Sequence, residues 1–283
     1  MLSNTVLLAK AEKLGLYGLV THWPAIDQTV KVEELLGWEE TERSERGLKN
    51  RLKRSKLDKF KMLSDFDWDW PTKCDREQIE DIMQLDFLKD TVNIIILGPN
   101  GVGKSMIASN IIYQGILSGH TALFVTASQM LNDLSSQDGN HALNRRLKYY
   151  ASPGILYIDE LAYLSYSHAH ADLLFEIISR RYQKKSTVVT GNLPFNEWDK
   201  IFPNAACVVS LIDRLIHASE IVNIEGPSYR LKEAKEASAK RQKTRSKKKP
   251  STTPNAVEQD PYYLEGHLSG NASIEPESTP EDA

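Results

Sequence analysis

The sequence predicts an α/β protein in which a parallel sheet lies between two layers of helices, after a small helical N-terminal domain. From residue 90 to about residue 232, short apolar segments alternate with segments of helical periodicity, which is typical of strands joined by crossover helices. A glycine-rich loop follows the first strand, and a later strand ends in two acidic residues. The expected strands are residues 92–97, 121–126, 155–159, 186–190 and 220–224, and the expected helices lie near residues 104–118, 128–135, 169–184 and 208–217.

The glycine-rich loop matches the phosphate-binding pattern G-x-x-x-x-G-K-[ST] over residues 98–105. Glycine lets the loop backbone turn its N–H groups toward phosphate oxygens, and the N-terminus of the next helix favours the same negative charge. We expect Lys104 to reach the β- and γ-phosphates of a nucleotide and the Ser105 hydroxyl to bind Mg²⁺. The alternative is a coincidental glycine turn, which the strand before the loop and the helix after it disfavour.

The acidic residues Asp159 and Glu160 follow a buried strand and complete the predicted site. The strand places Asp159 beside the phosphate-binding loop, where its carboxylate could hold Mg²⁺ directly or through water. Glu160 suits a general base that orients or deprotonates the attacking water. Simple solvation of a strand end is the alternative for both. The intervening strand at residues 121–126 is typical of hydrolases that use a glutamate rather than of small-molecule kinases.

Asn192 follows the next expected strand and is the candidate to sense the γ-phosphate or the attacking water, although it could merely cap the turn before Pro194. The residues expected to contact ATP are Gly98, Pro99, Asn100, Gly101, Val102, Gly103, Lys104, Ser105, Met106 and Asp159, with Mg²⁺ on Ser105 and Asp159.

Three arginines are candidates for an arginine finger, which would enter a neighbouring subunit's site and stabilise transition-state charge. Arg214 lies in the amphipathic segment 211–215, and Arg180 and Arg181 precede the strand at 186–190. A surface arginine paired with an acid is the alternative, and the residues alone favour it for Arg214.

Charge is strongly segregated along the chain, although the formal net charge of the 283 residues is only −3. Residues 43–61 hold nine Lys or Arg against two acids, and residues 240–249 hold seven and no acid. Residues 255–283 hold seven acids and no Lys or Arg. This pattern favours a polyanionic partner for the basic segments. The segment 240–249 could instead fold over the acidic end of the chain.

A helix is expected over residues 39–62, with basic side chains at steps of three or four along one side. The alternatives are a solvated helix face and a face that binds the phosphates of DNA. The candidate DNA-binding residues are Arg43, Arg46, Lys49, Lys53, Arg54 and Lys56.

We therefore expect a helical domain at residues 1–64, which carries the candidate DNA-binding residues, a linker at 65–89, an ATPase domain at 90–234 and a disordered charged tail at 235–283. The aromatic residues of the linker could clamp the next domain or simply pack against its core. No segment resembles a signal peptide or a membrane span, so we expect a cytoplasmic protein. Cys74 and Cys207 match no metal or redox spacing, and neither do His168, His170 and His217.

With these motifs together, the sequence resembles the IstB-like family of AAA+ ATPases, from about residue 7 to residue 233. The segments that carry the resemblance are residues 97–105, 158–164, 178–182, 190–198, 211–215 and 226–231. The Asn-Leu-Pro-Phe-x-Glu-Trp segment at 192–198 and the Asp-Arg-Leu segment at 213–215 are the most specific. Departures are Asn100 and Ser105 in the loop, and Tyr166, His168 and His170 after the acidic pair.

The resemblance implies an AAA+ P-loop fold and a helper ATPase for insertion-sequence transposition. It implies self-assembly with ATP sites between subunits, binding and bending of double-stranded DNA, and a partner transposase. It also favours Arg214 over Arg181 as the finger, acting in trans. Arg230 lies in one of the family's motif segments, and we assign it no catalytic role. A DnaC-like loader of the replicative helicase is the main alternative, followed by a small-metabolite kinase and a DNA-binding scaffold that does not hydrolyse ATP.

Overall fold

The computed structural model describes residues 4–26, 32–57, 59–161, 167–202 and 207–247. By its internal contacts the chain forms one compact unit over Met1–Ala237 and a second over Ser238–Ala283. None of the helices that the structure describes combines the length and the apolar character that crossing a bilayer requires.

The first unit is built on a sheet of five parallel strands in the order β2-β3-β4-β1-β5. The strands are β1 (Asn93–Leu97), β2 (Ala122–Thr126), β3 (Ile155–Asp159), β4 (Ser186–Gly191) and β5 (Ser219–Asn223). Each lies within one residue of its expected range at either end. Strand β1 pairs with β4 and β5, so the chain leaves β1 where the strand order reverses. Loops at the carboxyl ends of such strands form the usual ligand-binding crevice of an open α/β sheet.

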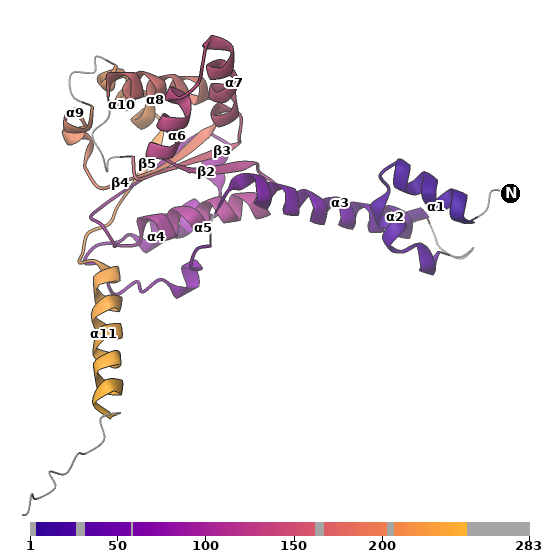
Figure 1. The fold of residues 1–283 in the computed structure, drawn as a ribbon, viewed down its shortest axis with the longest axis horizontal. Helices are drawn as coiled ribbons and strands as arrows, with labels where there is room; N and C mark the ends of the chain where they lie inside the picture. The colour runs from indigo at the N-terminus through magenta and orange to yellow at the C-terminus, as the bar shows by residue number, and fades with distance from the viewer. Residues whose placement is uncertain (1–3, 27–31, 58, 162–166, 203–206, 248–283) are drawn as a thin grey trace, which may run out of the picture. The chain divides into compact units, whose positions relative to one another are not determined.

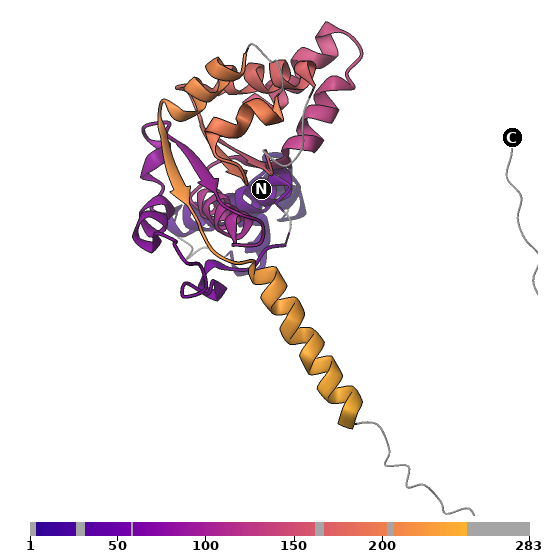
Figure 2. The same ribbon diagram turned by 90° about the vertical axis from the view of Figure 1, so that its left-hand side faces the viewer.

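Helices cover both faces of this sheet (Figures 1 and 2). Alternation along β1 sends Ile94 and Ile96 to one apolar core, and Ile95 and Leu97 to the other. The first core contains α4 (Arg76–Met83) and α5 (Lys104–Leu117). The second contains α6 (Ala127–Ser135), α7 (Asn140–Ala151), α8 (His168–Arg181), α9 (Trp198–Ile201) and α10 (Val208–Ile216). The predicted three-layer α/β class is therefore confirmed.

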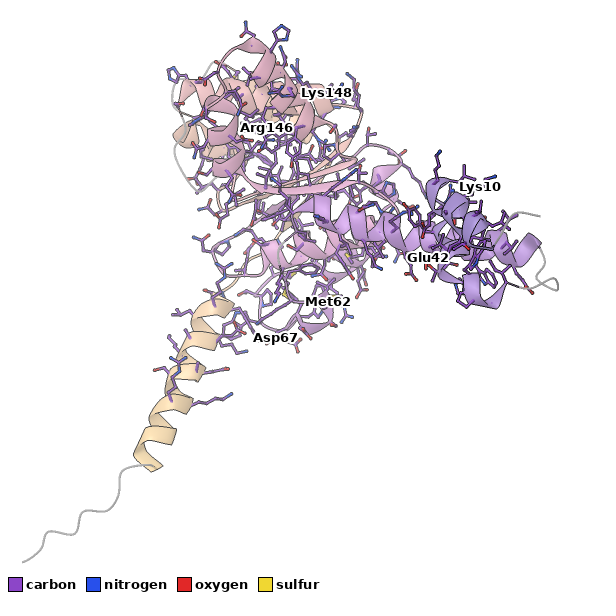
Figure 3. All side chains as sticks on the ribbon, turned by 45° about the vertical axis from the view of Figure 1, so that its right-hand side comes forward. Lys10, Glu42, Met62, Asp67, Arg146 and Lys148 are labelled. Atoms are coloured by element: carbon purple, nitrogen blue, oxygen red, sulfur yellow. The ribbon has the colours of Figure 1, made fainter. Side chains whose placement is uncertain are left out.

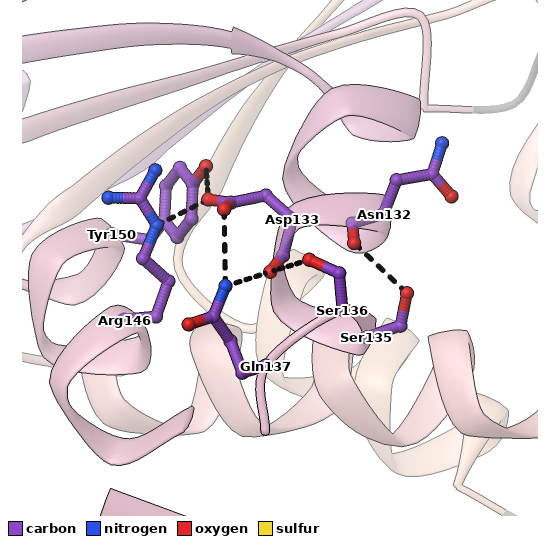
Figure 4. A network of polar contacts seen from close by, with 7 residues as sticks. All are labelled: Asn132, Asp133, Ser135, Ser136, Gln137, Arg146 and Tyr150. Atoms are coloured by element: carbon purple, nitrogen blue, oxygen red, sulfur yellow. Dashed lines mark hydrogen bonds and ion pairs between the residues drawn. The ribbon is translucent and has the colours of Figure 1, made fainter. Parts of the chain in front are cut away.

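Helix α7 is absent from the sequence-based expectation. Its apolar positions are few, and only Leu147 and Tyr150 are fully buried. A polar network fastens it to α6, because the Asp133 carboxylate accepts from Nε of Arg146 and from the Tyr150 hydroxyl, both at 2.5 Å (Figure 4). Gln137 also donates to Asp133 at 3.4 Å. Polar contacts between distant residues thus supplement the small apolar face of α7, and hydrophobic periodicity does not detect them.

The N-terminal helices are α1 (Asn4–Lys13), α2 (Tyr17–Thr21) and α3 (Val32–Ser55). Helix α3 begins and ends about seven residues earlier than the expected 39–62. Near its start it packs closely on α2, since a Cβ at Gly18 would lie 2.2 Å from the Trp38 backbone. The Gly18 N–H donates to the Glu39 carboxylate at 2.8 Å. Near its end, Leu48 and Leu52 pack against the core that contains α5.

Helix α11 (Tyr229–Lys247) corrects the expectation of a disordered tail from residue 235. Residues 235–247 are helical, because Lys, Glu, Ala, Arg and Gln have high helix propensity. Residues 248–283 of the expected tail lie outside the described residues. The remaining short elements are the 3-10 helices Trp23–Ala25, Leu63–Asp65, Asp86–Leu88 and Phe195–Glu197.

Candidate nucleotide-binding site

A cavity of about 370 Å³ lies at the carboxyl ends of β1, β3 and β4. It brings together residues that the sequence analysis took from separate segments: the phosphate-binding loop, the acidic pair and Asn192. The predicted site residues that line it are Asn100, Gly101, Val102, Gly103, Lys104, Ser105, Met106, Asp159, Glu160 and Asn192. Gly98 and Pro99, at the start of the loop, contact the Lys104 side chain through their carbonyl oxygens.

The phosphate-binding loop requires glycine at two positions because other segments approach it closely. Gly103 has a φ of 104°, and a Cβ there would lie 2.4 Å from the ring of Phe66. Gly101 has a φ of 84°, and a Cβ there would lie 2.2 Å from the Ser228 hydroxyl. Side chains other than glycine rarely adopt such dihedrals. The loop is therefore enclosed by the segment before α4 and by the residues that begin α11.

Lys104 is held within the loop rather than extended into solvent. Its ammonium group donates to the carbonyl oxygens of Gly98 at 2.7 Å and Pro99 at 2.8 Å. Burial lowers the pKa of Lys104, and the nearby charge of Arg230 lowers it further, whereas Asp159 and Glu160 oppose this change. Arg230 lines the same cavity, so a phosphate bound there would meet two cations.

Ser105 and Asp159 meet where a divalent cation would bind. The Ser105 hydroxyl donates to Oδ1 of Asp159 at 3.1 Å. The Thr190 hydroxyl, at the end of β4, donates to the same carboxylate oxygen. Hydroxyl and carboxylate oxygens are the ligands that Mg²⁺ prefers, so these residues fit the cation that the phosphate-binding loop implies. Thr190 is not among the site residues predicted from the sequence, although it lies two residues before Asn192.

Glu160 and Asn192 flank this pair of oxygen ligands. Glu160 has a φ of 58°, a left-handed conformation that costs a residue with a side chain about 1–2 kcal/mol, and its N–H donates to the Thr190 hydroxyl at 3.1 Å. Its carboxylate is exposed in the cavity. The Oδ1 atom of Asn192 is buried and finds no hydrogen-bond partner among the described residues. Strained backbone and unpaired buried atoms are both common at functional sites.

Leu57, residues 59–71 and the start of α11 form the remaining wall of the cavity, which we call the cover. Two ion pairs join its halves, Lys61 with Glu233 at 2.7 Å and Asp67 with Lys232 at 3.2 Å. Met62 and Asp67 mark its first half in Figure 3. The Trp70 indole donates to the Pro227 carbonyl at 2.9 Å. Of the linker aromatics, Phe66 and Trp68 pack against the core, as one of the two alternatives has it, and Phe66 and Trp70 line the cavity.

The candidate finger arginines differ sharply in their surroundings. Arg181 is fully buried, and its guanidinium donates to the carbonyls of Ala151, Pro153, Gly154 and Ser186 and to the Thr187 hydroxyl. A side chain enclosed in this way cannot reach a neighbouring subunit, so the suggestion of Arg181 as a finger is wrong. Arg180 pairs with Glu176 at 2.7 Å and donates to Asn144 at 3.0 Å.

Arg214 is half-buried on α10 and packs against α8. Its guanidinium lies 4.6 Å from the ring centroid of Phe175 and donates to the Ser179 hydroxyl. Arg214 is not one of the described residues that line the cavity, so it lies outside the site of its own chain.

The six candidate DNA-binding residues do not share one environment. Arg43 pairs with Glu39 at 2.5 Å, and the Arg46 guanidinium lies 4.0 Å from the ring centroid of Tyr17, so both support the packing of α2 on α3. Lys49, Lys53, Arg54 and Lys56 are exposed. Lys56 lies just after α3, and its ammonium is 5.6 Å from the Tyr149 ring centroid on α7.

Residues 9–237 match the family described as IstB-like ATP binding protein. The chain belongs to this family. The insertion sequence IS21 ATP-binding protein of Pseudomonas aeruginosa is 34% identical over 195 residues, which cover 69% of this chain and 74% of that protein. The insertion sequence IS5376 ATP-binding protein of Geobacillus stearothermophilus is 35% identical over 199 residues, which cover 70% and 79% of the two chains.

Among solved structures, AMPPCP-bound DnaA from Aquifex aeolicus matches with a TM-score of 0.51 and 20% identity, covering 65% of this chain and 56% of that one. At this identity the match shows the AAA+ fold alone. As an IstB-like protein, the chain is an ATP-binding protein with a P-loop, and the nucleotide-binding reading of residues 98–105 agrees with the family to which it belongs.

Proposed function

We propose that this IstB-like chain is an ATPase that assembles on duplex DNA and helps an insertion-sequence transposase. The observation that carries the proposal is the meeting of Lys104, the Ser105–Asp159 pair and Glu160 around one cavity. A protein that only bound ATP would need the loop but not an exposed carboxylate beside it. The names of its relatives, which belong to insertion sequences, support transposition as the setting.

Each residue has a distinct task in this proposal. Lys104 binds the β- and γ-phosphates, and Arg230 adds a second positive charge at the same cavity. Ser105 and Asp159 hold Mg²⁺, which neutralises phosphate charge that develops during hydrolysis. Glu160 accepts a proton from, or orients, the attacking water, and the Asn192 amide helps to fix its position. Asn192 suits this task because its buried Oδ1 has no hydrogen-bond partner among the described residues.

Arg214 completes the site of a neighbouring subunit. Its exclusion from the cavity of its own chain supports action in trans. Contact with Phe175 and Ser179 restricts its side chain, so the guanidinium is presented with little loss of rotamer freedom. Hydrolysis then depends on assembly, because each ATP site needs a residue from another copy.

The exposed cations at the end of α3 supply contacts to DNA phosphates, and α7 extends the same basic surface. Arg145 and Lys148 are exposed on α7, which carries no acidic residue. Figure 3 shows Lys148 on this helix. The end of α3 and α7 are neighbours, because the Lys56 ammonium lies close to the Tyr149 ring. A surface of this kind binds the DNA backbone without reading sequence.

The deciding experiment measures ATP hydrolysis with and without duplex DNA in the parent protein, Lys104→Ala and Glu160→Gln. We expect DNA to stimulate the parent. Lys104→Ala should lose ATP binding and assembly. Glu160→Gln should bind ATP and DNA but release phosphate at least about a hundredfold more slowly.

Parental turnover by Glu160→Gln would contradict the assignment of the base. Appearance of phosphate on a small-molecule acceptor would favour a metabolite kinase, and absence of turnover in the parent would favour a scaffold. Co-purification with a replicative helicase instead of a transposase would favour a helicase loader.

A further inference from the structure

Tyr157 lies at the centre of β3, two residues before Asp159 and therefore on the same face of the strand. Its side chain is fully buried, and its ring centroid lies 5.1 Å from that of Phe124. Its hydroxyl faces Ser105, Asp159 and Thr190. Even so, that hydroxyl makes no well-formed hydrogen bond with any of the described residues.

Packing alone does not explain this hydroxyl. The other side chains that the sheet directs into the same core are apolar, and they include Ile94, Ile96, Ile155 and Val188. Phenylalanine would fill the space of the Tyr157 ring equally well. Burying a hydroxyl without a partner costs about 1–3 kcal/mol. If residue 157 served only to pack the core, phenylalanine would therefore be the more stable choice. The hydroxyl instead faces Ser105 and Asp159, the residues that would hold the cation.

We propose that Tyr157 is a positioning residue for Asp159, whose carboxylate its hydroxyl orients from inside the core. This inference rests on the proposed nucleotide and magnesium site. Oδ1 of Asp159 already accepts hydrogen bonds from Ser105 and Thr190. Tyr157 is a third hydroxyl near the same group, and a small shift of its side chain or of the carboxylate would complete the bond. The third donor limits rotation of the carboxylate, so that one of its oxygens stays directed at the cation.

Hydrogen bonds behind a metal ligand typically change metal affinity by about 10- to 100-fold when they are removed. Because Asp159 keeps two other donors, we expect the Tyr157→Phe protein to lie near the lower limit, with about tenfold weaker Mg²⁺ binding. Binding of nucleotide without Mg²⁺ should not change, because Lys104 and the loop backbone are untouched. A defect in core packing would weaken both kinds of binding together.

The chain offers a matched control in Tyr150→Phe. Tyr150 is also buried, and its hydroxyl donates to a carboxylate, that of Asp133, in the network between α6 and α7 (Figure 4). Tyr150→Phe removes the same atom from a structural network. It should lower the unfolding temperature and leave the Mg²⁺ dependence at the parental value.

The experiment titrates Mg²⁺ into each full-length protein with a fluorescent non-hydrolysable ATP analogue, and repeats the titration with Mn²⁺ followed by electron paramagnetic resonance. A tenfold higher half-saturating Mg²⁺ for Tyr157→Phe alone supports the inference. Equal half-saturation in Tyr157→Phe and the parent overturns it. A parent whose nucleotide binding ignores Mg²⁺ overturns the proposed site itself.

A second measurement avoids dependence on the folding of the variant. Fluorotyrosine placed at position 157 should give a fluorine NMR signal that shifts when Mg²⁺ joins the nucleotide-bound protein. The same label at position 150 should not respond. No shift at position 157, in a protein that binds Mg²⁺ and nucleotide, overturns the inference.

Discussion

The ring of Phe66 lies against Gly103 so closely that a Cβ at residue 103 would come within 2.4 Å of its Cε2 atom. This contact joins the residues that follow the basic helix α3 to the loop that binds phosphate. Lys61 and Leu63 add to it through Asn110 of α5, whose amide accepts from the Leu63 N–H and donates to the Lys61 carbonyl, both at 3.0 Å.

Gly103→Ala should abolish nucleotide binding. The substitution combines a φ of 104° with the clash against Phe66, so the loop must change shape. Gly119→Ala is the control, because its φ is 96° but nothing lies within 4 Å of the added Cβ. The control should lose about 1–2 kcal/mol of stability and keep parental affinity for a fluorescent ATP analogue. Equal affinity in Gly103→Ala and the parent would show that Phe66 yields at little cost.

Arg181→Met should strongly destabilise the protein, because several buried carbonyl groups would lose their donor at once. Each unsatisfied group costs about 1–3 kcal/mol, so we expect a loss of at least about 3 kcal/mol in urea denaturation. Arg180→Met, in which a partly exposed ion pair with Glu176 is lost, should cost no more than about 1 kcal/mol. Similar losses in both variants would contradict the structural role of Arg181.

Arg214→Ala and Glu160→Gln should each hydrolyse ATP poorly alone but regain activity when mixed. In a mixed assembly, some sites combine the intact Glu160 of one chain with the intact Arg214 of the next. We expect up to about a quarter of parental turnover in an equal mixture, as random pairing dictates, if finger action is worth the usual factor of a thousand or more. Thermal melting of Arg214→Ala checks that loss of the Phe175 contact has not unfolded it. A mixture no more active than its parts would rule out action in trans.

Lys53→Ala and Lys148→Ala should each weaken duplex DNA binding in a salt-dependent way. A lysine that neutralises one phosphate contributes about one unit to the slope of log affinity against log salt. The charge-matched control is Lys89→Ala, an exposed lysine that pairs with Asp86 at 2.6 Å beside α4. Fluorescence anisotropy between low and moderate salt measures the slopes. If Lys148→Ala kept the parental slope of log affinity against log salt, α7 would not be part of the DNA-binding surface.

Local patterns predict much of the site because its chemistry resides in short continuous segments. A strand, a glycine loop and a helix must follow one another for Lys104 to reach a phosphate, so the order of residues 92–118 carries the information. The alternation of strands and helices likewise predicts all five strands of the sheet. The helix at residues 39–62 was placed about seven residues too late, because turns and caps decide where a helix begins.

Residues that depend on distant neighbours are not predictable in this way. Arg181 and Arg214 look alike in the sequence, yet Arg181 is enclosed by the carbonyl groups of two segments, whereas Arg214 lies half-buried on α10. Helix α7 depends on Asp133, and its exposed cations become part of a basic surface only through the approach of Lys56.

By itself, the amino-acid order determined the fold class, the phosphate-binding loop and the acidic pair, because hydrophobic periodicity and loop geometry act over a few residues. Only the tertiary structure decided that Tyr157 and Thr190 lie behind Asp159, that Phe66 and Arg230 enclose the cavity, and that Arg181 is part of the core. The physical reason is that burial and hydrogen bonding depend on which segments pack together. The separations involved, such as the 31 residues between Asp159 and Thr190, exceed any local pattern.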